Sequence, residues 1–243
     1  RDELEADVIV VADSGNWTVE TPAITVALRG NVTFKLTVST LEHASHSGMF
    51  GGAVPDAMLA TTKLLATLWD DAGDVAVEGL VSRDADTPEY TEATLRAETG
   101  LLDGVTPIGT GSILSRIWDR PSITITGIDA PSVMNASNTL IPSVAVKVSV
   151  RVAPGQRATD AAAAVREHLF ANAPFGAVLD VADVVTGEPF LVDTTAPSFE
   201  TAKQALHAGF GVAPIEIGVG GSIPFISELV EVFPAAQILV TGV

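Results

Sequence analysis

Two stretches of the chain alternate between apolar and polar residues, with Ala145 as the one exception among the polar positions. Every second residue is apolar over residues 32–39 and again over residues 144–152. Successive side chains of a strand point to opposite faces, so each stretch predicts a strand with one buried and one polar face. Arg151 falls on the polar face, near the end of the second strand. The pattern is typical of an antiparallel sheet that is covered on one side.

Further elements are predicted from shorter patterns. Residues 8–12 are a short run of apolar, mostly β-branched residues, typical of a fully buried strand. Other strands are expected at residues 23–28, 122–127 and 177–185, and helices at residues 55–69 and 158–170, the second capped by Thr159 or Asp160. Together with the two alternating strands, these elements predict an α+β layer with helices on one face of an antiparallel sheet.

The last part of the chain follows a different pattern. A helix is expected at residues 198–208, a strand at 215–219, a helix at 223–233 and a strand at 237–241. This alternation is typical of an α/β domain. The α/β pieces at the two ends of the chain are therefore expected to belong to one domain that the α+β layer interrupts.

Charge and composition narrow the possible functions. The hydrophobic content of 47% predicts a packed globular core, and the net charge of −17 would repel nucleic acid and anionic membranes. Ten acidic residues against two arginines give residues 70–103 a local net charge of −8, which predicts a solvated insertion with one short helix. The chain has no cysteine, so a metal site would use His, Asp and Glu, and a cytoplasmic location is expected.

A segment rich in glycine and histidine follows the first alternating strand. His43 and His46 are three residues apart within residues 42–57, but the neighbouring serines and glycines predict a loop, so a metal site formed by this pair is not expected. A histidine in a loop can instead donate a hydrogen bond to charge that develops on a substrate oxygen. The alternative is an ordinary surface histidine.

Two other segments carry candidate chemistry. Gly221 and Ser222 join a strand to a helix, where free N–H groups and a hydroxyl can bind an anion, although Ser222 could equally cap the helix. Arg151 could supply the matching cation, or it could form a surface ion pair. Asp13 follows the first strand and could be a ligand for a divalent ion or simply a turn residue.

These segments, taken in order, resemble the M20 metallopeptidase family, and within it the carnosinase-like dipeptidases. The matching motifs cover nearly the whole chain: Ala12-Asp13-Ser14-Gly15, Leu28-Arg29-Gly30, His46-Ser47-Gly48, Thr139-Leu140-Ile141-Pro142, Arg151-Val152-Ala153-Pro154 and Gly220-Gly221-Ser222-Ile223-Pro224.

The resemblance implies a two-domain homodimer with a di-metal centre, usually zinc, that hydrolyses dipeptides with a metal-activated water. A ferredoxin-like lid and dimerisation domain would occupy residues 30–193, with the acidic insertion at about 70–120. Residues 1–29 and 194–243 would be pieces of the α/β catalytic domain. Neither a nucleic acid nor a membrane is expected as a partner.

The resemblance also implies roles for single residues. Asp13 matches a metal ligand, and His46 matches the lid histidine that reaches the partner subunit's active site. Thr139, Arg151, Ser222 and Gly221 match positions that hold the substrate and its C-terminal carboxylate.

Other residues of the family pattern are missing from these 243. The other metal ligands and the Glu general base of the family would lie before residue 1 or after residue 243. The chain is therefore expected to be an internal fragment, inactive on its own, and residues 1–7 are expected to be the end of a helix.

Two alternatives remain open from the sequence. The chain could be the dimerisation module of a non-catalytic relative. It could also come from an enzyme of the same family that removes acyl groups from N-acyl amino acids or hydrolyses carbamoyl amides.

Overall fold

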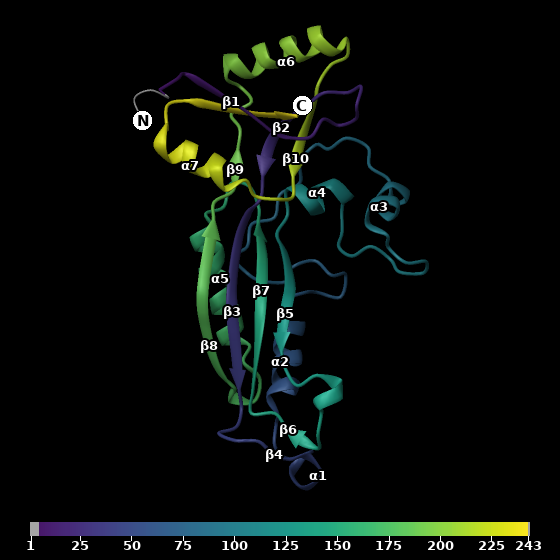
Figure 1. Cartoon of the computed structure of the whole chain (residues 1–243), viewed down its shortest axis with the longest axis vertical. Coiled ribbons are helices and arrows are strands. Elements are labelled where there is room, and N and C mark those ends of the chain that lie inside the picture. Colours follow the sequence, from purple (N-terminus) through teal and green to yellow (C-terminus); the bar gives the residue numbers. More distant parts are fainter. Residues whose placement is uncertain (1–4, 243) are drawn as a thin grey trace.

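The structure, a computed structural model, describes residues 5–242 and places two β-sheets one above the other along its long axis (Figure 1). Of the helix end expected at residues 1–7, residues 1–4 lie outside the described part, and residues 5–7 form no helix. Within residues 5–242, no helix has the length and apolar content needed to cross a membrane.

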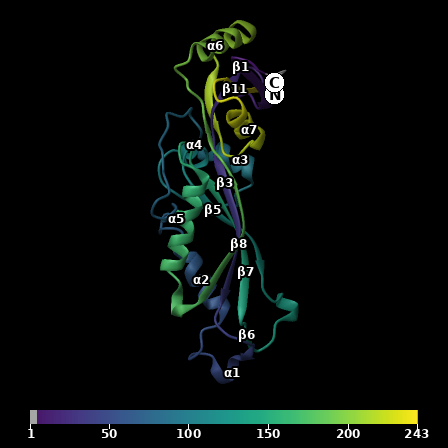
Figure 2. The ribbon, with the colours of Figure 1, turned by 90° about the vertical axis from the view of Figure 1, so that its left-hand side faces the viewer.

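The lower sheet is the α+β layer that the sequence predicts. Its strands are β3 (Gly30–Ser39), β5 (Ser122–Asp129), β7 (Ser143–Val152) and β8 (Val178–Gly187), in the order β5-β7-β3-β8, and every neighbouring pair is antiparallel. Helices α2 (Ala57–Ala66) and α5 (Ala158–Ala171) cover one face, as Figure 2 shows. The α+β fold class is thereby confirmed.

The alternating strands supply the core of this layer. Their apolar side chains are buried against α2 and α5, while the polar residues between them face away from the helices. The buried side chains of β3 and β7 are Val32, Phe34, Leu36, Val38, Val144, Val146, Val148, Val150 and Val152. At roughly 25 cal/mol per Å² of apolar surface, burial of this face is the main stabilising contribution to the layer.

The upper sheet is formed by the two ends of the chain. It contains β1 (Val8–Ser14), β11 (Gln237–Gly242), β2 (Ala23–Leu28) and β10 (Ile215–Val219) in that order, and β9 (Phe190–Leu191) also pairs with β2. Helices α6 (Pro197–Phe210) and α7 (Pro224–Val232) pack against it. The ends of the chain therefore share one sheet, as expected.

Some details of the sequence predictions are wrong. β1 is a strand, but its residues are exposed or half-buried, because among the described residues it pairs only with β11. The helix expected to reach Trp69 ends at Ala66. Neither Thr159 nor Asp160 caps α5: its N-cap residue is Arg157, and the Glu188 carboxylate accepts a hydrogen bond from the Ala158 N–H.

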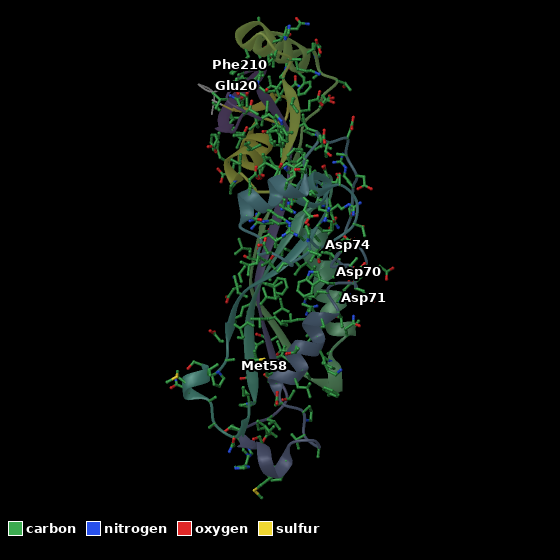
Figure 3. All side chains as sticks on the ribbon, turned by 90° about the vertical axis from the view of Figure 1, so that its right-hand side faces the viewer. Glu20, Met58, Asp70, Asp71, Asp74 and Phe210 are labelled. Carbon is green, nitrogen blue, oxygen red and sulfur yellow. The ribbon has the colours of Figure 1, made fainter. Side chains whose placement is uncertain are left out.

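The acidic insertion is more ordered than its charge suggests. It contains α3 (Glu92–Thr99), which corresponds to the expected short helix, and a further helix, α4 (Ile113–Trp118), that was not predicted. Figure 3 shows Asp70, Asp71 and Asp74 along one side of it. The Asp74 carboxylate accepts hydrogen bonds from the N–H and hydroxyl of Thr110. One of the acidic side chains therefore holds two distant segments of the insertion together.

The far end of the lower sheet carries a small ribbon. β4 (Ser45–His46) pairs with β6 (Thr139–Leu140), and one-turn helix α1 (Ser47–Phe50) and the 3-10 turn η2 (Val133–Asn135) flank this ribbon. A second 3-10 turn, η3 (Pro174–Gly176), precedes β8. We call β4, β6, α1 and η2 together the tip; Figure 1 shows it at the end farthest from the upper sheet.

Candidate functional site

His46 is presented by the tip with a defined tautomer. Its Nδ1 accepts a hydrogen bond from the Gly48 N–H at 3.1 Å, which caps α1. In a neutral imidazole the nitrogen that accepts carries no proton, so Nε2 carries it and can donate. His46 is exposed, so Nε2–H is available to a ligand. The loop expected here is in fact a one-turn helix after His46, and this helix fixes the ring.

Thr139 lies directly opposite His46 on the ribbon. The two residues are paired between β4 and β6, and the Ser47 N–H donates to the Asn138 carbonyl at 2.9 Å. The Thr139 and Ser137 hydroxyls are 2.7 Å apart. The ribbon thus holds an imidazole and a hydroxyl side by side.

Arg151 and Ser222 lie together at the other end of the lower sheet. Arg151 is paired with Asn31 of β3, and the Ser222 hydroxyl donates to the Asn31 side-chain oxygen at 3.5 Å. Ser222 does not cap α7, because the N-cap residue is Ile223 and no side chain caps this helix. A β-carbon on Gly221 would contact only Val219, at 4.0 Å, so space remains beside the backbone. We call Arg151, Ser222 and Gly221 the anion seat.

The Arg151 guanidinium is available to a ligand. It is half-buried, and among residues 5–242 it has neither a hydrogen-bond partner nor an ion-pair partner. Within the described part of the chain, the surface ion pair considered from the sequence is absent. An unpaired guanidinium next to a hydroxyl can bind a carboxylate through two parallel hydrogen bonds.

Arg29 and Asp119 add charge next to the anion seat. The pKa of Arg29 is lowered to about 10, chiefly by burial and then by the nearby Arg151 cation, whereas Asp119 acts in the opposite direction. Burial also raises the pKa of the Asp119 carboxyl, against the effect of Arg83 and Arg29. Arg29 lies in one of the motifs noted from the sequence but was given no role there, and Asp119 was not singled out; the available signal was an arginine directly after a buried strand.

The predicted site residues fall into two groups at opposite ends of the lower sheet. Asn31, beside Arg151, is the second residue of β3, and Ser39 ends this strand before the tip. Ten residues at about 3.3 Å each place the anion seat and His46 about 30 Å apart, too far for one dipeptide to contact both. Asp13 is on β1 in the upper sheet and is exposed.

The described residues do not fit a metal centre. Among residues 5–242, no three His, Asp or Glu side chains are close enough to share an ion. Two metal ions about 4 Å apart require several such ligands, so Asp13 alone cannot form the site.

Comparison with known sequences identifies relatives along the whole chain. Residues 26–176 match the M20 family model of the peptidase dimerisation domain. The cysteinylglycine-S-conjugate dipeptidase of Corynebacterium striatum is 34% identical, over 98% of this chain and 53% of its own length. The Beta-Ala-His dipeptidase of Homo sapiens is 26% identical, over 96% of this chain and 49% of its own. The chain spans about half the length of the curated relatives it matches.

Solved structures share the fold. Human carnosine dipeptidase 1 aligns over 97% of this chain and 52% of its own, with a TM-score of 0.66 and 25% identity. The di-peptidase Dug1p from Saccharomyces cerevisiae aligns over 98% of this chain and 52% of its own, with a TM-score of 0.74 and 23% identity. Both sheets of this chain therefore have counterparts in these enzymes.

Proposed function

The chain belongs to the M20 peptidases, and from this we propose that it forms the dimerisation lid and adjoining catalytic-domain parts of a metal-dependent dipeptidase. The proposed boundaries are residues 1–29 and 194–243 for the catalytic-domain pieces and 30–193 for the lid, with the insertion at about 70–120. The division is supported by the two sheets, because the strands of the lower sheet all lie within residues 30–193 and β1, β2, β10 and β11 of the upper sheet lie outside it; only β9 of the upper sheet falls inside the proposed lid.

The separation between His46 and the anion seat is the observation that carries the proposal. One chain holds both groups about 30 Å apart along β3, so a single copy cannot place them on one small substrate. In a twofold symmetric dimer, the tip of one copy can reach the anion seat of the other, which completes two equivalent sites. We therefore propose a homodimer that pairs through the lid.

Exposed apolar side chains support pairing at the tip. Val133 and Met134 on η2 are 94% and 91% exposed, and Met49 and Phe50 on α1 are also exposed. Such residues on the segments that flank His46 are suited to contact with a second protein surface.

The roles proposed for the site residues follow from their chemistry. Arg151 and Ser222, with the open backbone at Gly221, bind the C-terminal carboxylate of the dipeptide. His46 from the partner copy donates its Nε2 proton to the oxygen on which negative charge develops, and Thr139 holds the substrate beside it. Preorganised donors of this kind typically contribute about 3 kcal/mol to stabilisation of the transition state.

The metal centre is proposed for the longer protein only. Relatives such as the Cys-Gly metallodipeptidase of Schizosaccharomyces pombe are named as metal enzymes, and zinc is the ion we expect, with Asp13 as one ligand. Because the described residues hold no such centre, we expect no hydrolysis by these 243 residues alone. A cytoplasmic location stays a prediction from the sequence.

The test is an assay of the longer protein that contains this chain. With zinc present, we expect hydrolysis of dipeptides that have a free C-terminal carboxylate, and loss of that activity in the His46→Ala variant, with His43→Ala as the matched control. Activity on N-acyl amino acids with none on dipeptides would select the deacylase alternative. A folded, zinc-loaded protein that cleaves neither would favour the non-catalytic module.

A further inference from the structure

Arg29 occupies the junction between the two sheets. β2 of the upper sheet ends at Leu28 and β3 of the lower sheet begins at Gly30, so Arg29 is the only residue between them. Its N–H donates to the Val219 carbonyl at the end of β10, at 3.2 Å. The backbone of Arg29 is thus fixed to the upper sheet at the point where the chain enters the lower one.

The Arg29 side chain then bonds to both parts of the molecule. Nε donates to the Gly220 carbonyl at 3.0 Å, in the loop that carries Ser222. Nη1 reaches the carbonyls of Arg116 and Arg120 at 3.4 Å each and the Ser122 hydroxyl at 3.2 Å. One guanidinium therefore connects the β10–α7 loop, the end of α4 and the start of β5.

The surrounding packing is tight. A β-carbon on Gly220 would lie 2.6 Å from the Ile117 carbonyl and 2.8 Å from an Arg29 nitrogen. A β-carbon on Gly218 would lie 2.6 Å from the Trp118 side chain. Helix α4 of the insertion therefore contacts β10 and its loop directly, and Arg29 fills the space behind this contact.

The charge of Arg29 is not cancelled by a direct ion pair. Arg29 is only 8% exposed, and no carboxylate of residues 5–242 lies within ion-pair distance of it. Its hydrogen-bond acceptors are neutral carbonyls and a hydroxyl, and the charged groups that act on its pKa are Arg151 and Asp119. A buried cation held in this way leaves a positive field at the anion seat, which favours a carboxylate.

We propose that Arg29 is a positioning residue: its guanidinium holds the Gly220–Ser222 loop and α4 at the junction, so that the two sheets keep one relative angle and Ser222 stays aligned with Arg151. The claim that Arg29 keeps Ser222 aligned with Arg151 for a ligand rests on the function proposed above. The claim that Arg29 fixes the angle between the sheets does not depend on that function.

The angle can be measured in this chain directly. Because the chain has no cysteine, Ala163→Cys on α5 and Ala205→Cys on α6 provide two exposed spin-label sites, one on each side of the junction. Double electron–electron resonance should give one narrow distribution of the distance between the two spin labels when no other residue is changed. Arg29→Met should broaden it about twofold, because methionine removes all four hydrogen bonds.

Two further variants make the result specific. Arg29→Lys keeps the charge but cannot donate hydrogen bonds to several acceptors in the way a guanidinium can, so a distance distribution of intermediate width is expected. If Arg29→Met fails to fold, Arg29→Lys tests the proposal in its place. Arg166→Met, on the exposed face of α5, is the control and should leave the distribution unchanged. An unchanged width in a folded Arg29 variant would overturn the proposal.

Kinetics of the longer protein test separately whether Arg29 supports ligand binding. Arg29→Met should raise the KM for a dipeptide about tenfold while kcat changes less than about threefold, and Arg29→Lys should recover part of the loss. An unchanged KM would contradict the claim that Arg29 supports ligand binding. If the unmodified protein cleaves no dipeptide, the proposed function fails, while the spin-label distances still decide the role of Arg29.

Discussion

Gly30 and Gly187 lie so close together that a β-carbon on Gly30 would come within 2.6 Å of the Gly187 carbonyl oxygen. Gly30 begins β3, where the chain enters the lower sheet, and Gly187 ends β8, where it leaves. The same β-carbon on Gly30 would also lie 2.8 Å from Pro189. Backbone atoms on both sides leave no room for a side chain. The junction between the sheets is therefore tightly packed at this point.

The first prediction concerns this contact. Gly30→Ala should lower the free energy of unfolding by about 1–3 kcal/mol, because the backbone must shift to admit a methyl group. Gly15→Ala is the matched control, since a β-carbon there would meet nothing within 4 Å, and its effect should stay within about 0.5 kcal/mol. Urea unfolding followed by circular dichroism measures both. Equal free energies of unfolding for the two variants would contradict this prediction, because they would show that the backbone near Gly30 can shift at little cost.

The second prediction concerns the order of the insertion. Tyr90, the only tyrosine of the chain, donates a hydrogen bond to the Glu98 carboxylate, which raises its pKa to about 12. The folded-state pKa lies above the ordinary value of about 10, so this stabilisation is present below pH 10 and is lost as the pH rises to 12. Absorbance at ~295 nm should titrate near pH 12, and nearer 10 in Glu98→Gln. A midpoint near 10 in the unmodified chain would contradict the Tyr90–Glu98 contact.

The third prediction concerns the anion seat. In the longer protein, Arg151→Met should raise the KM for a dipeptide about 10- to 100-fold, because a charged hydrogen bond to the carboxylate is lost. The same variant should barely change the weak turnover of a C-terminally amidated dipeptide, which has no carboxylate to bind. Arg157→Met, an exposed arginine after the same strand, is the control. An equal loss on both substrates would mean that Arg151 does not bind the carboxylate.

The fourth prediction concerns the tip. Light scattering of the 243-residue chain at high concentration should give twice its mass of 25.1 kDa. Replacing Val133 and Met134 by serine should weaken the dimer about tenfold or more, whereas Leu102→Ser, also highly exposed but on the insertion, should not. A monomer at every concentration would refute the pairing.

Much of the fold could be predicted from local sequence patterns. The alternation in β3 and β7 gave the buried face, and the strand at Ile215–Val219 was predicted with its exact bounds. Local patterns failed where distant contacts decide the outcome. α4 is short and lies outside the most acidic stretch. It is held by contacts with Arg29, about 90 residues earlier in the chain, and with β10, about 100 residues later.

The candidate site could be predicted only in part. Motifs identified His46, Thr139, Arg151 and Ser222, but no local pattern shows that β3 separates the first two from the last two. The role of Arg29 was missed because its partners come from three distant segments. The alternative that Ser222 caps the helix is wrong, because its hydroxyl bonds to Asn31, another distant residue.

The central claim, that each active site takes His46 from one copy and Arg151 from the other, is tested most directly by mixing two inactive variants of the longer protein. Assayed with dipeptide well below the KM of the unmodified protein, His46→Ala and Arg151→Met should each be nearly inactive alone. Refolded together in equal amounts, half of the dimers combine one copy of each variant and contain one intact site of two, so about a quarter of the original activity should return. Two differently tagged His46→Ala preparations, mixed in the same way, should recover none. No recovery in the His46→Ala and Arg151→Met mixture, with mixed dimers shown to form, would contradict the claim.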